Sequence, residues 1–248
     1  MEEYAYITPL LASAFYLAAS ARLLRLHRQT GERPELLLGV SFALWGIYYL
    51  GYNVPSLLRL EPWPHAIEWA FEWLYVLGVF PYMTFTRAVF RPDGAWASAL
   101  VGICSACLLV GAAMGTLEGQ VVYSLGNSWF IVEWVGYTTP CAWLCVEAMV
   151  YRHGARKRAR LGLVEPLVVN RYLLLALFGG FQVLACLSDL SFAHDISSTQ
   201  AASLVSNVLL GGTEIASVLV LWLAFFPLPF YANWIAHRAA IPPTSVEA

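Results

Sequence analysis

The stretch WASALVGICSACLLVGAAMGT, residues 96–116, contains no charged side chain. An α-helix needs roughly 20 predominantly apolar residues to cross the hydrocarbon core of a bilayer. This stretch is therefore long enough for one crossing. It is rich in Ala, Gly and Cys, and small residues allow helices to pack closely within a membrane.

Similar apolar stretches lie on both sides of this one. They are found near residues 4–26, 36–58, 66–90, 128–151, 170–190 and 201–226. The segments that separate them are short, so we expect no inserted soluble domain. The sequence predicts an all-α polytopic membrane protein in which one bundle of seven transmembrane helices occupies residues 1–248.

The composition supports this class. Charged residues make up 12% of the 248 residues and hydrophobic residues 59%, whereas soluble domains carry about 25% charged residues. So little charge excludes an ordinary cytosolic enzyme, and so much hydrophobicity excludes a disordered chain. The net charge of −2 gives no basic footprint for nucleic acid.

The positions of the basic residues predict the orientation. Thirteen of the 14 Lys and Arg residues follow the first, third or fifth apolar stretch or lie in the C-terminal tail, and Arg59 alone falls on the other side. Cytoplasmic loops carry the excess of positive charge, so we expect the N-terminus outside and the C-terminus in the cytoplasm. Nearly all of these residues are Arg, which suggests a GC-rich genome but names no source. We take a bacterial inner (plasma) membrane as the expected location.

The densest basic segment is YRHGARKRAR, residues 151–160. One interpretation is a topology determinant held near anionic lipid headgroups. The other is a surface on residues 152–160 that binds a cytoplasmic protein partner.

Carboxylic side chains interrupt several apolar stretches, and ionisable groups inside a bilayer usually mark function. They are Glu68, Glu72, Glu133, Asp189 and Glu214. No basic residue lies in the middle of a predicted span. We expect these acids either to be protonated hydrogen-bond donors between helices or to surround a proton, a metal ion or an organic amine.

Helical spacing indicates where the acids meet. Glu68 and Glu72 share one helix face, as do Asn207 and Glu214. Aromatic rings, which attract organic cations, accompany them. We expect an acidic, aromatic-lined pocket in the outer half of the bundle. Its predicted ligand-binding residues are Glu68, Glu72, Glu133, Asp189, Glu214, Trp69, Trp73, Trp134, Tyr137 and Asn207.

Metal and cofactor chemistry can be tested against the same residues. His65, Glu68 and Glu72 lie on one face and have the ligand types of a zinc or iron site, although a solvated histidine at the interface explains His65 equally well. No cofactor is predicted. The single lysine, Lys157, lies in a predicted loop, so a retinal Schiff base lacks its amine, and no span carries a buried His pair for haem.

Three segments carry a resemblance to a known family. They are Trp45–Asn53, the stretch LYVLGVFP at 74–81, and Asn170-Arg171 at the start of the sixth span. In these segments the chain resembles the seven-helix sensor modules at the N-termini of some bacterial histidine kinases and related signalling proteins. The resemblance implies a module that receives a signal in the membrane and passes it to a cytoplasmic output. Here that output is expected to be a separate partner.

Four functions remain open. The first is a receptor-like or accessory subunit that binds a small ligand or partner in its outer half and shifts between two helix packings. The second is a proton- or cation-coupled transporter that uses the same acids. The third is a structural subunit of a membrane complex. The fourth, a metal-dependent enzyme acting on lipid, has too few histidines, so we expect a protein that is not an enzyme.

Overall fold

The computed structural model describes residues 2–58, 65–118, 127–195 and 200–240, and every element in these ranges is a helix. This confirms the predicted all-α class. In chain order the helices are α1 (Glu2–Thr30), α2 (Arg33–Leu57), α3 (His65–Phe90), α4 (Ala95–Leu117), α5 (Ser128–Ala159), α6 (Pro166–Asp195), α7 (Gln200–Phe225) and α8 (Pro229–Ala240).

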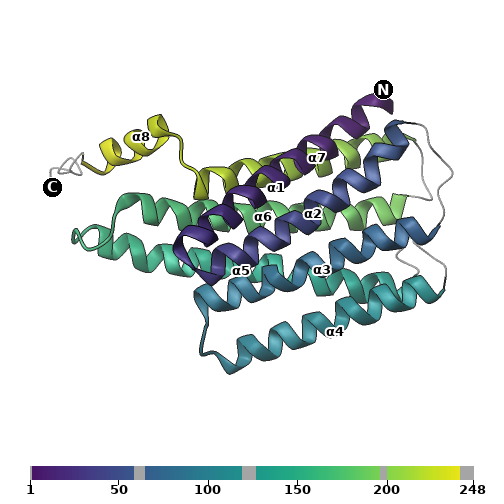
Figure 1. Cartoon of the computed structure of the whole chain (residues 1–248), viewed down its shortest axis with the longest axis horizontal. Coiled ribbons are helices and arrows are strands. Elements are labelled where there is room, and N and C mark those ends of the chain that lie inside the picture. Colours follow the sequence, from purple (N-terminus) through teal and green to yellow (C-terminus); the bar gives the residue numbers. More distant parts are fainter. Residues whose placement is uncertain (1, 59–64, 119–126, 196–199, 241–248) are drawn as a thin grey trace, which may run out of the picture.

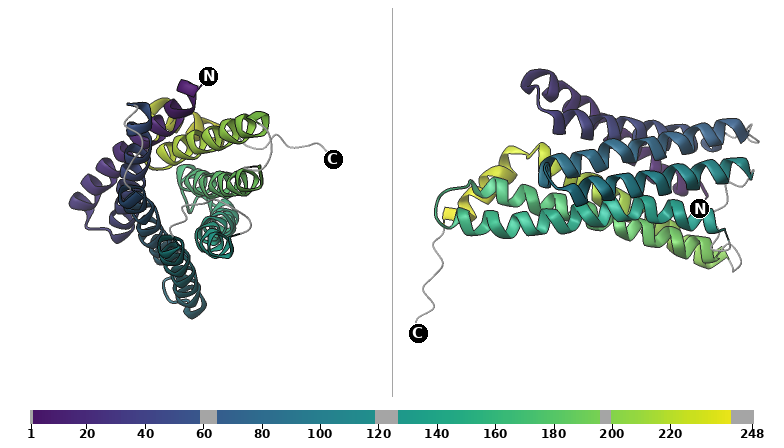
Figure 2. Two further views of the ribbon diagram at one scale, coloured as in Figure 1. Left: turned by 90° about the vertical axis from the view of Figure 1, so that its right-hand side faces the viewer. Right: turned by 90° about the horizontal axis from the view of Figure 1, so that it is seen from below.

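The long helices lie side by side and alternate in direction (Figure 1). Seen along the bundle, α1 to α4 follow one another in a curved row, and α5 to α7 form a second row that faces it (Figure 2). From α1 to α7 each helix contacts the next one in sequence, and further contacts join α1 to α7, α3 to α5 and α6 to α8. The two rows therefore enclose a common interior.

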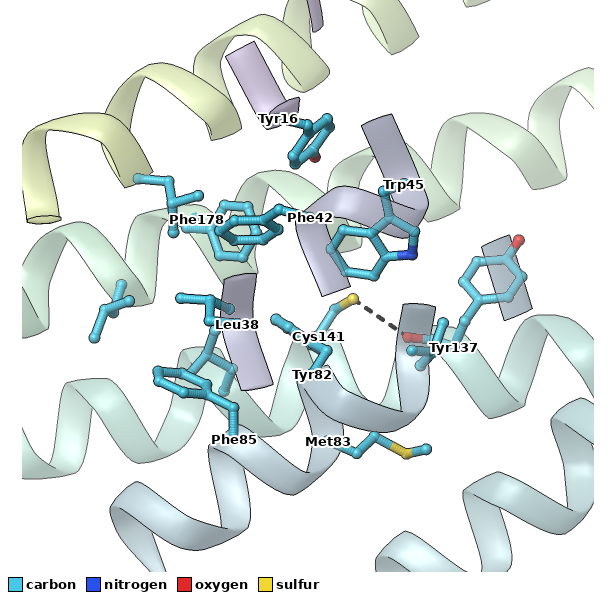
Figure 3. Close-up of a cluster of buried hydrophobic side chains, with 14 of the residues drawn as sticks. Tyr16, Leu38, Phe42, Trp45, Tyr82, Met83, Phe85, Tyr137, Cys141 and Phe178 are labelled. Carbon is cyan, nitrogen blue, oxygen red and sulfur yellow. Dashed lines mark hydrogen bonds between the residues drawn. The ribbon is translucent and has the colours of Figure 1, made fainter. Parts of the chain in front are cut away.

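Large aromatic side chains fill this interior. Tyr16, Phe42, Tyr82 and Phe178 are fully buried or nearly so, and they come from α1, α2, α3 and α6. Their rings meet edge to face or tilted, with centroids 5.5 Å apart for Tyr16–Phe42 and 6.0 Å apart for Phe42–Phe178 (Figure 3). Such ring pairs add to the stabilisation from burial, and they hold the two rows together.

The basic segment predicted as a loop is helical instead. Helix α5 continues without interruption to Ala159, and a turn beginning at Arg160 leads to α6 at Pro166. Arg, Lys and Ala favour helix. Positive charges in the last turn, here Arg156, Lys157 and Arg158, also interact favourably with the negative end of the helix dipole. Helix α5 therefore has no reason to stop where its apolar run ends.

Three helical segments in the described ranges are long and apolar enough to cross a membrane. They are Arg33–Gly51, Ala95–Leu117 and Pro166–Leu190, and the pair Gly211–Phe225 and Pro229–Ile235, bent by 74°, would make a fourth.

The outer surface of the bundle is apolar to a degree that water-soluble proteins avoid. Ile103 on α4 and Val146 on α5 are each 61% exposed. Other large apolar side chains face outward on the remaining long helices, among them Leu11, Ile47, Leu77, Leu184 and Leu219. Such a surface is compatible with a membrane protein, whose exposed face contacts lipid.

Candidate functional site

Glu214 lies at the centre of a buried hydrogen-bond network. It sits on α7, is 7% exposed, and accepts hydrogen bonds from two tyrosines on other helices. The Tyr49 hydroxyl on α2 donates to Oε1 at 2.9 Å, and the Tyr16 hydroxyl on α1 donates to Oε2 at 3.1 Å. One carboxyl group thus joins three helices.

Two further polar side chains extend this network. Nε2 of Gln182, on α6, donates to the Tyr16 hydroxyl at 3.1 Å and to Oγ of Ser217 at 2.9 Å. The Ser217 hydroxyl in turn donates to the backbone carbonyl of Glu214 at 2.8 Å. Tyr16, Gln182 and Ser217 are all buried. Buried polar groups that are fully hydrogen-bonded fix one arrangement of the core.

A row of tyrosine rings leads from Glu214 toward a second carboxyl group. Tyr16 stacks on Tyr49 with centroids 5.9 Å apart and an interplanar angle of 3°. Tyr48 and Tyr75 continue the row, with centroid separations of 5.1 Å for Tyr49–Tyr48 and 5.0 Å for Tyr48–Tyr75.

The row ends at Asp189 on α6. Tyr75 meets Tyr137 edge to face at 5.9 Å. The Tyr137 hydroxyl donates to Oδ2 of Asp189 at 3.5 Å, the outer limit of a hydrogen bond. The tyrosines therefore form a continuous aromatic connection between Asp189 and the Glu214 network.

Three pairs among the four predicted acids whose positions are described lie within electrostatic range of each other. Asp189 on α6 interacts electrostatically with Glu214 on α7 and with Glu72 on α3. Glu133 on α5 interacts with Glu72 in the same way. Within the described part of the chain, none of the four forms an ion pair with a basic side chain. The ion pair found there joins Arg91 to a different acid, Glu147, at 2.8 Å. We call Glu72, Glu133, Asp189 and Glu214 the carboxyl cluster.

Close helix contacts position this cluster. A Cβ on Gly111 would lie only 2.5 Å from Cβ of Glu133, so α4 approaches α5 closely at the level of that carboxyl. Three of the four acids lie near one end of their helices, Glu72 and Glu133 near the starts of α3 and α5 and Asp189 near the end of α6. Because neighbouring helices are antiparallel, these positions fall at one end of the bundle.

The predicted tryptophans serve mainly to join helices. Nε1 of Trp134 donates to the backbone carbonyl of Cys186 at 2.8 Å, which links α5 to α6. Nε1 of Trp73 donates to Oγ1 of Thr116 at 3.3 Å, which links α3 to α4. Trp69 is half-buried on α3. The function of these rings as walls of a ligand site stays a prediction.

Some predicted residues lie outside the described side chains. These are His65, Glu68 and Asn207. Where side chains are described, no group of three His, Cys, Asp or Glu residues is arranged to hold a metal ion. Of the three candidate metal ligands His65, Glu68 and Glu72, only the side chain of Glu72 is among those described.

The sequence prediction missed the partners of Glu214. Tyr16, Tyr49, Gln182 and Ser217 were not among the predicted site residues, yet they supply its network. A signal for Tyr16 existed, because Ser13, Tyr16 and Ser20 follow one face of an otherwise apolar helix. Ser13 and Ser20 are buried there and donate to backbone carbonyls of α2.

Carboxylates brought together in an apolar interior repel one another, and neutrality then requires shared protons or a bound cation. The geometry thus suits reversible binding of positive charge. Comparison with known proteins does not assign this chain to a family. No protein-family model matches this chain, and neither a curated protein nor a solved structure matches it.

Proposed function

We propose that this protein is an integral membrane sensor that binds a small cation, either a proton or an organic amine, at the carboxyl cluster and signals through a cytoplasmic protein partner. The proposal depends chiefly on one observation. Asp189 lies within electrostatic range of Glu72 and Glu214, and Glu133 lies within range of Glu72, so carboxyl groups from four helices are linked in three pairs; none of the four has a basic partner among the described residues.

The proposal includes a topology. All seven long helices, α1 to α7, cross the membrane, with the N-terminus outside and the C-terminus in the cytoplasm of a bacterial cell. Two facts support it: the apolar outer surface runs over every long helix, and 13 of the 14 basic residues belong to one end of the bundle or the tail. Glu72, Glu133 and Asp189 then lie in the outer half, and Glu214 lies near the middle of the membrane.

The bundle offers a way for the bound cation to change the structure. When a cation is bound at the cluster, its carboxyl groups move closer together. When the cation leaves, the negatively charged carboxylates repel one another and push α3, α5, α6 and α7 apart. A ligand shifts such an equilibrium only through its different affinity for the two packings. Tyr16 and Tyr49 would report the change to α1 and α2 because both bond to Glu214.

Charge removal tests the proposal directly. The variants Glu133→Gln and Glu214→Gln remove a negative charge from the cluster, and Glu118→Gln, an exposed residue that accepts from Trp129 Nε1, is the matched control. Tryptophan fluorescence of the purified protein in lipid nanodiscs would be titrated with protons and with choline. We expect a saturable change in the parent protein and in Glu118→Gln.

The cluster variants should lose that change while still folding and inserting. If Glu133→Gln and Glu214→Gln respond like the parent protein, the carboxyl cluster is not the site. If no protein responds to either probe, the cluster only joins the helices, as expected of a structural subunit.

A second candidate function, proton- or cation-coupled transport, is favoured by one observation. Gln182, Tyr16, Glu214 and Tyr49 form a continuous hydrogen-bonded chain, and hydroxyl and carboxyl groups in series can pass protons. Proteoliposomes with a pH gradient separate the two functions. A transporter dissipates the gradient in a Glu214-dependent manner, whereas a sensor leaves it intact.

A further inference from the structure

Two buried thiols meet between α5 and α6. Cys141 on α5 is 6% exposed and Cys186 on α6 is 3% exposed. Both cysteines are free, and the side chain of Cys186 interacts directly with that of Cys141. Because the two residues belong to different helices, only the packing of the bundle brings their sulfur atoms together.

The surrounding contacts hold both cysteines in place. The Cys141 thiol donates to the backbone carbonyl of Tyr137 at 3.3 Å (Figure 3). The backbone carbonyl of Cys186 accepts from Nε1 of Trp134 at 2.8 Å. A Cβ on Gly179 would lie 2.8 Å from the carbonyl oxygen of Cys141, so α6 touches α5 beside the thiols. The two sulfur atoms are therefore pre-organised by the packing of their helices, as the donors of a binding site need to be.

A fully buried hydroxyl without a hydrogen-bond partner lies beside these thiols. Tyr82 on α3 is 0% exposed, and its hydroxyl forms no hydrogen bond with any described residue. It lies within electrostatic range of Cys141. Leaving a buried hydroxyl unpaired costs about 1–3 kcal/mol, and in folded proteins such groups mark a bound ion or water, or a functional site.

The number and type of donors favour one metal. Thiolate sulfur is a soft ligand that selects Cu(I) over hard cations. Structural zinc sites take four ligands, and among the described side chains no three Cys, His, Asp or Glu residues are arranged to hold one ion. Reduced copper, by contrast, is bound stably by two thiolates in a linear arrangement. A pair of buried thiols therefore suits Cu(I) better than zinc or iron.

We propose that Cys141 and Cys186 form a Cu(I) site in the interior of the bundle, with their two thiolate sulfur atoms as the metal ligands. The Tyr82 hydroxyl, which has no partner beside the neutral thiols, can donate a charge-assisted hydrogen bond to a thiolate. This site goes beyond the proposed binding of a proton or an organic amine, because its ligands are sulfur atoms and not the carboxyl cluster.

The carboxyl cluster supplies the charge balance that copper binding requires. Asp189 is one helical turn from Cys186, and the two side chains interact electrostatically. Each thiol loses its proton when it binds a metal. Two S–H bonds break, two Cu–S bonds form, and the two protons pass to carboxylates of the cluster. The interior then gains one net positive charge, which carboxylates without basic partners accommodate.

Anaerobic titration with Cu(I) tests the proposal. The full chain, reduced and held in lipid nanodiscs, competes for Cu(I) with bicinchoninate, whose copper complex is coloured. We expect the parent protein to bind about one equivalent. Cys141→Ser and Cys186→Ser should each weaken binding by about 100-fold or more, since loss of a group that only orients a metal ligand already costs about 10–100-fold. Cys145→Ser, one turn from Cys141, and Cys107→Ser on α4 are the matched controls and should bind like the parent.

X-ray absorption at the copper edge keeps the test decisive if a cysteine variant fails to fold. The copper-loaded parent protein should show two sulfur neighbours and no nitrogen or oxygen neighbour. The proposal is overturned if the parent takes up no Cu(I), if Cys141→Ser and Cys186→Ser bind like the parent, or if the spectrum shows three or four donors. Loss of binding in Cys107→Ser alone would also overturn it and would assign the metal to the Cys104 and Cys107 pair of α4.

Copper binding and cation sensing can fail independently. If the parent protein binds Cu(I) through both cysteines while its fluorescence does not respond to protons or choline, the copper site stands and the cation sensor fails. If fluorescence responds as proposed but no Cu(I) is bound, the sensor stands and the copper site fails.

Discussion

Two adjacent glycines on α6 provide a stringent test of the helix packing. A Cβ on Gly179 would lie 2.8 Å from the carbonyl oxygen of Cys141 and 2.9 Å from the amide nitrogen of Cys145, both backbone atoms of α5. A Cβ on Gly180 would meet only the Cys145 sulfur, at 3.8 Å. The variants Gly179→Ala and Gly180→Ala therefore add the same methyl group to the same helix in opposite packing environments.

The expected magnitudes follow from two opposing effects. Replacing Gly by Ala within a helix stabilises it by up to about 1 kcal/mol, and this gain applies to both variants. Ordinary carbon–oxygen contacts begin near 3.3 Å, so Gly179→Ala also has to separate α6 from α5 by about half an ångström. Overpacking of this kind costs roughly 1–3 kcal/mol. The difference between the two variants should therefore be about 1–3 kcal/mol, with Gly180→Ala the more stable.

Reversible unfolding in mixed detergent–lipid micelles, followed by circular dichroism during titration with dodecyl sulfate, measures this difference. Equal slopes for the parent and both variants would show that the same transition is being compared. If Gly179→Ala is as stable as Gly180→Ala, then α5 and α6 do not pack as closely as described.

Two further predictions concern the polar contacts. Tyr16→Phe should destabilise the fold by roughly 1–2 kcal/mol and Tyr49→Phe by about half as much. Interhelical hydrogen bonds in membranes contribute about 0.6 kcal/mol each, and Tyr16 makes two of them while Tyr49 makes one. Equal losses of stability in the same unfolding assay would disprove the network. Arg91→Met should lower the thermal midpoint by a few degrees, since it leaves the buried Glu147 without its cation, whereas Arg87→Met serves as the nearby control. The hydrogen bond and charge of Glu147 raise the pKa of Arg91, so this contribution persists as the pH rises through neutrality and is lost only above the unfolded-state pKa of arginine. An Arg91→Met effect that changes between roughly pH 6 and pH 9 would contradict the ion pair.

Much of the architecture was predictable because it depends on local chemistry. Apolar runs of about 20 residues predict helices whatever surrounds them, and each of the seven predicted ranges is occupied by a helix. The ends were predicted less well. Basic residues after Val150 were read as a loop, but Arg, Lys and Ala sustain a helix in water as well as in lipid, and α5 continues to Ala159.

The break near the C-terminus was also only partly predictable. Pro227 and Pro229 indicated the end of α7, since proline cannot continue a helix without losing a hydrogen bond. The separate helix α8 and its 74° bend away from α7 depend on contacts that bring it onto α6. One such contact is the hydrogen bond from Asn170 to the Tyr231 hydroxyl at 2.8 Å.

By itself, the sequence determined that this chain is helical, which acids are placed within apolar helices, and where its positive charge is concentrated, because each of these is a property of residues near one another in the chain. Only the tertiary structure decided that Asp189 interacts with Glu72 and Glu214, that Glu214 is held by Tyr16 and Tyr49, and that the thiols of Cys141 and Cys186 meet between α5 and α6. Most of those relations join residues more than a hundred positions apart, and the others depend on how neighbouring helices pack.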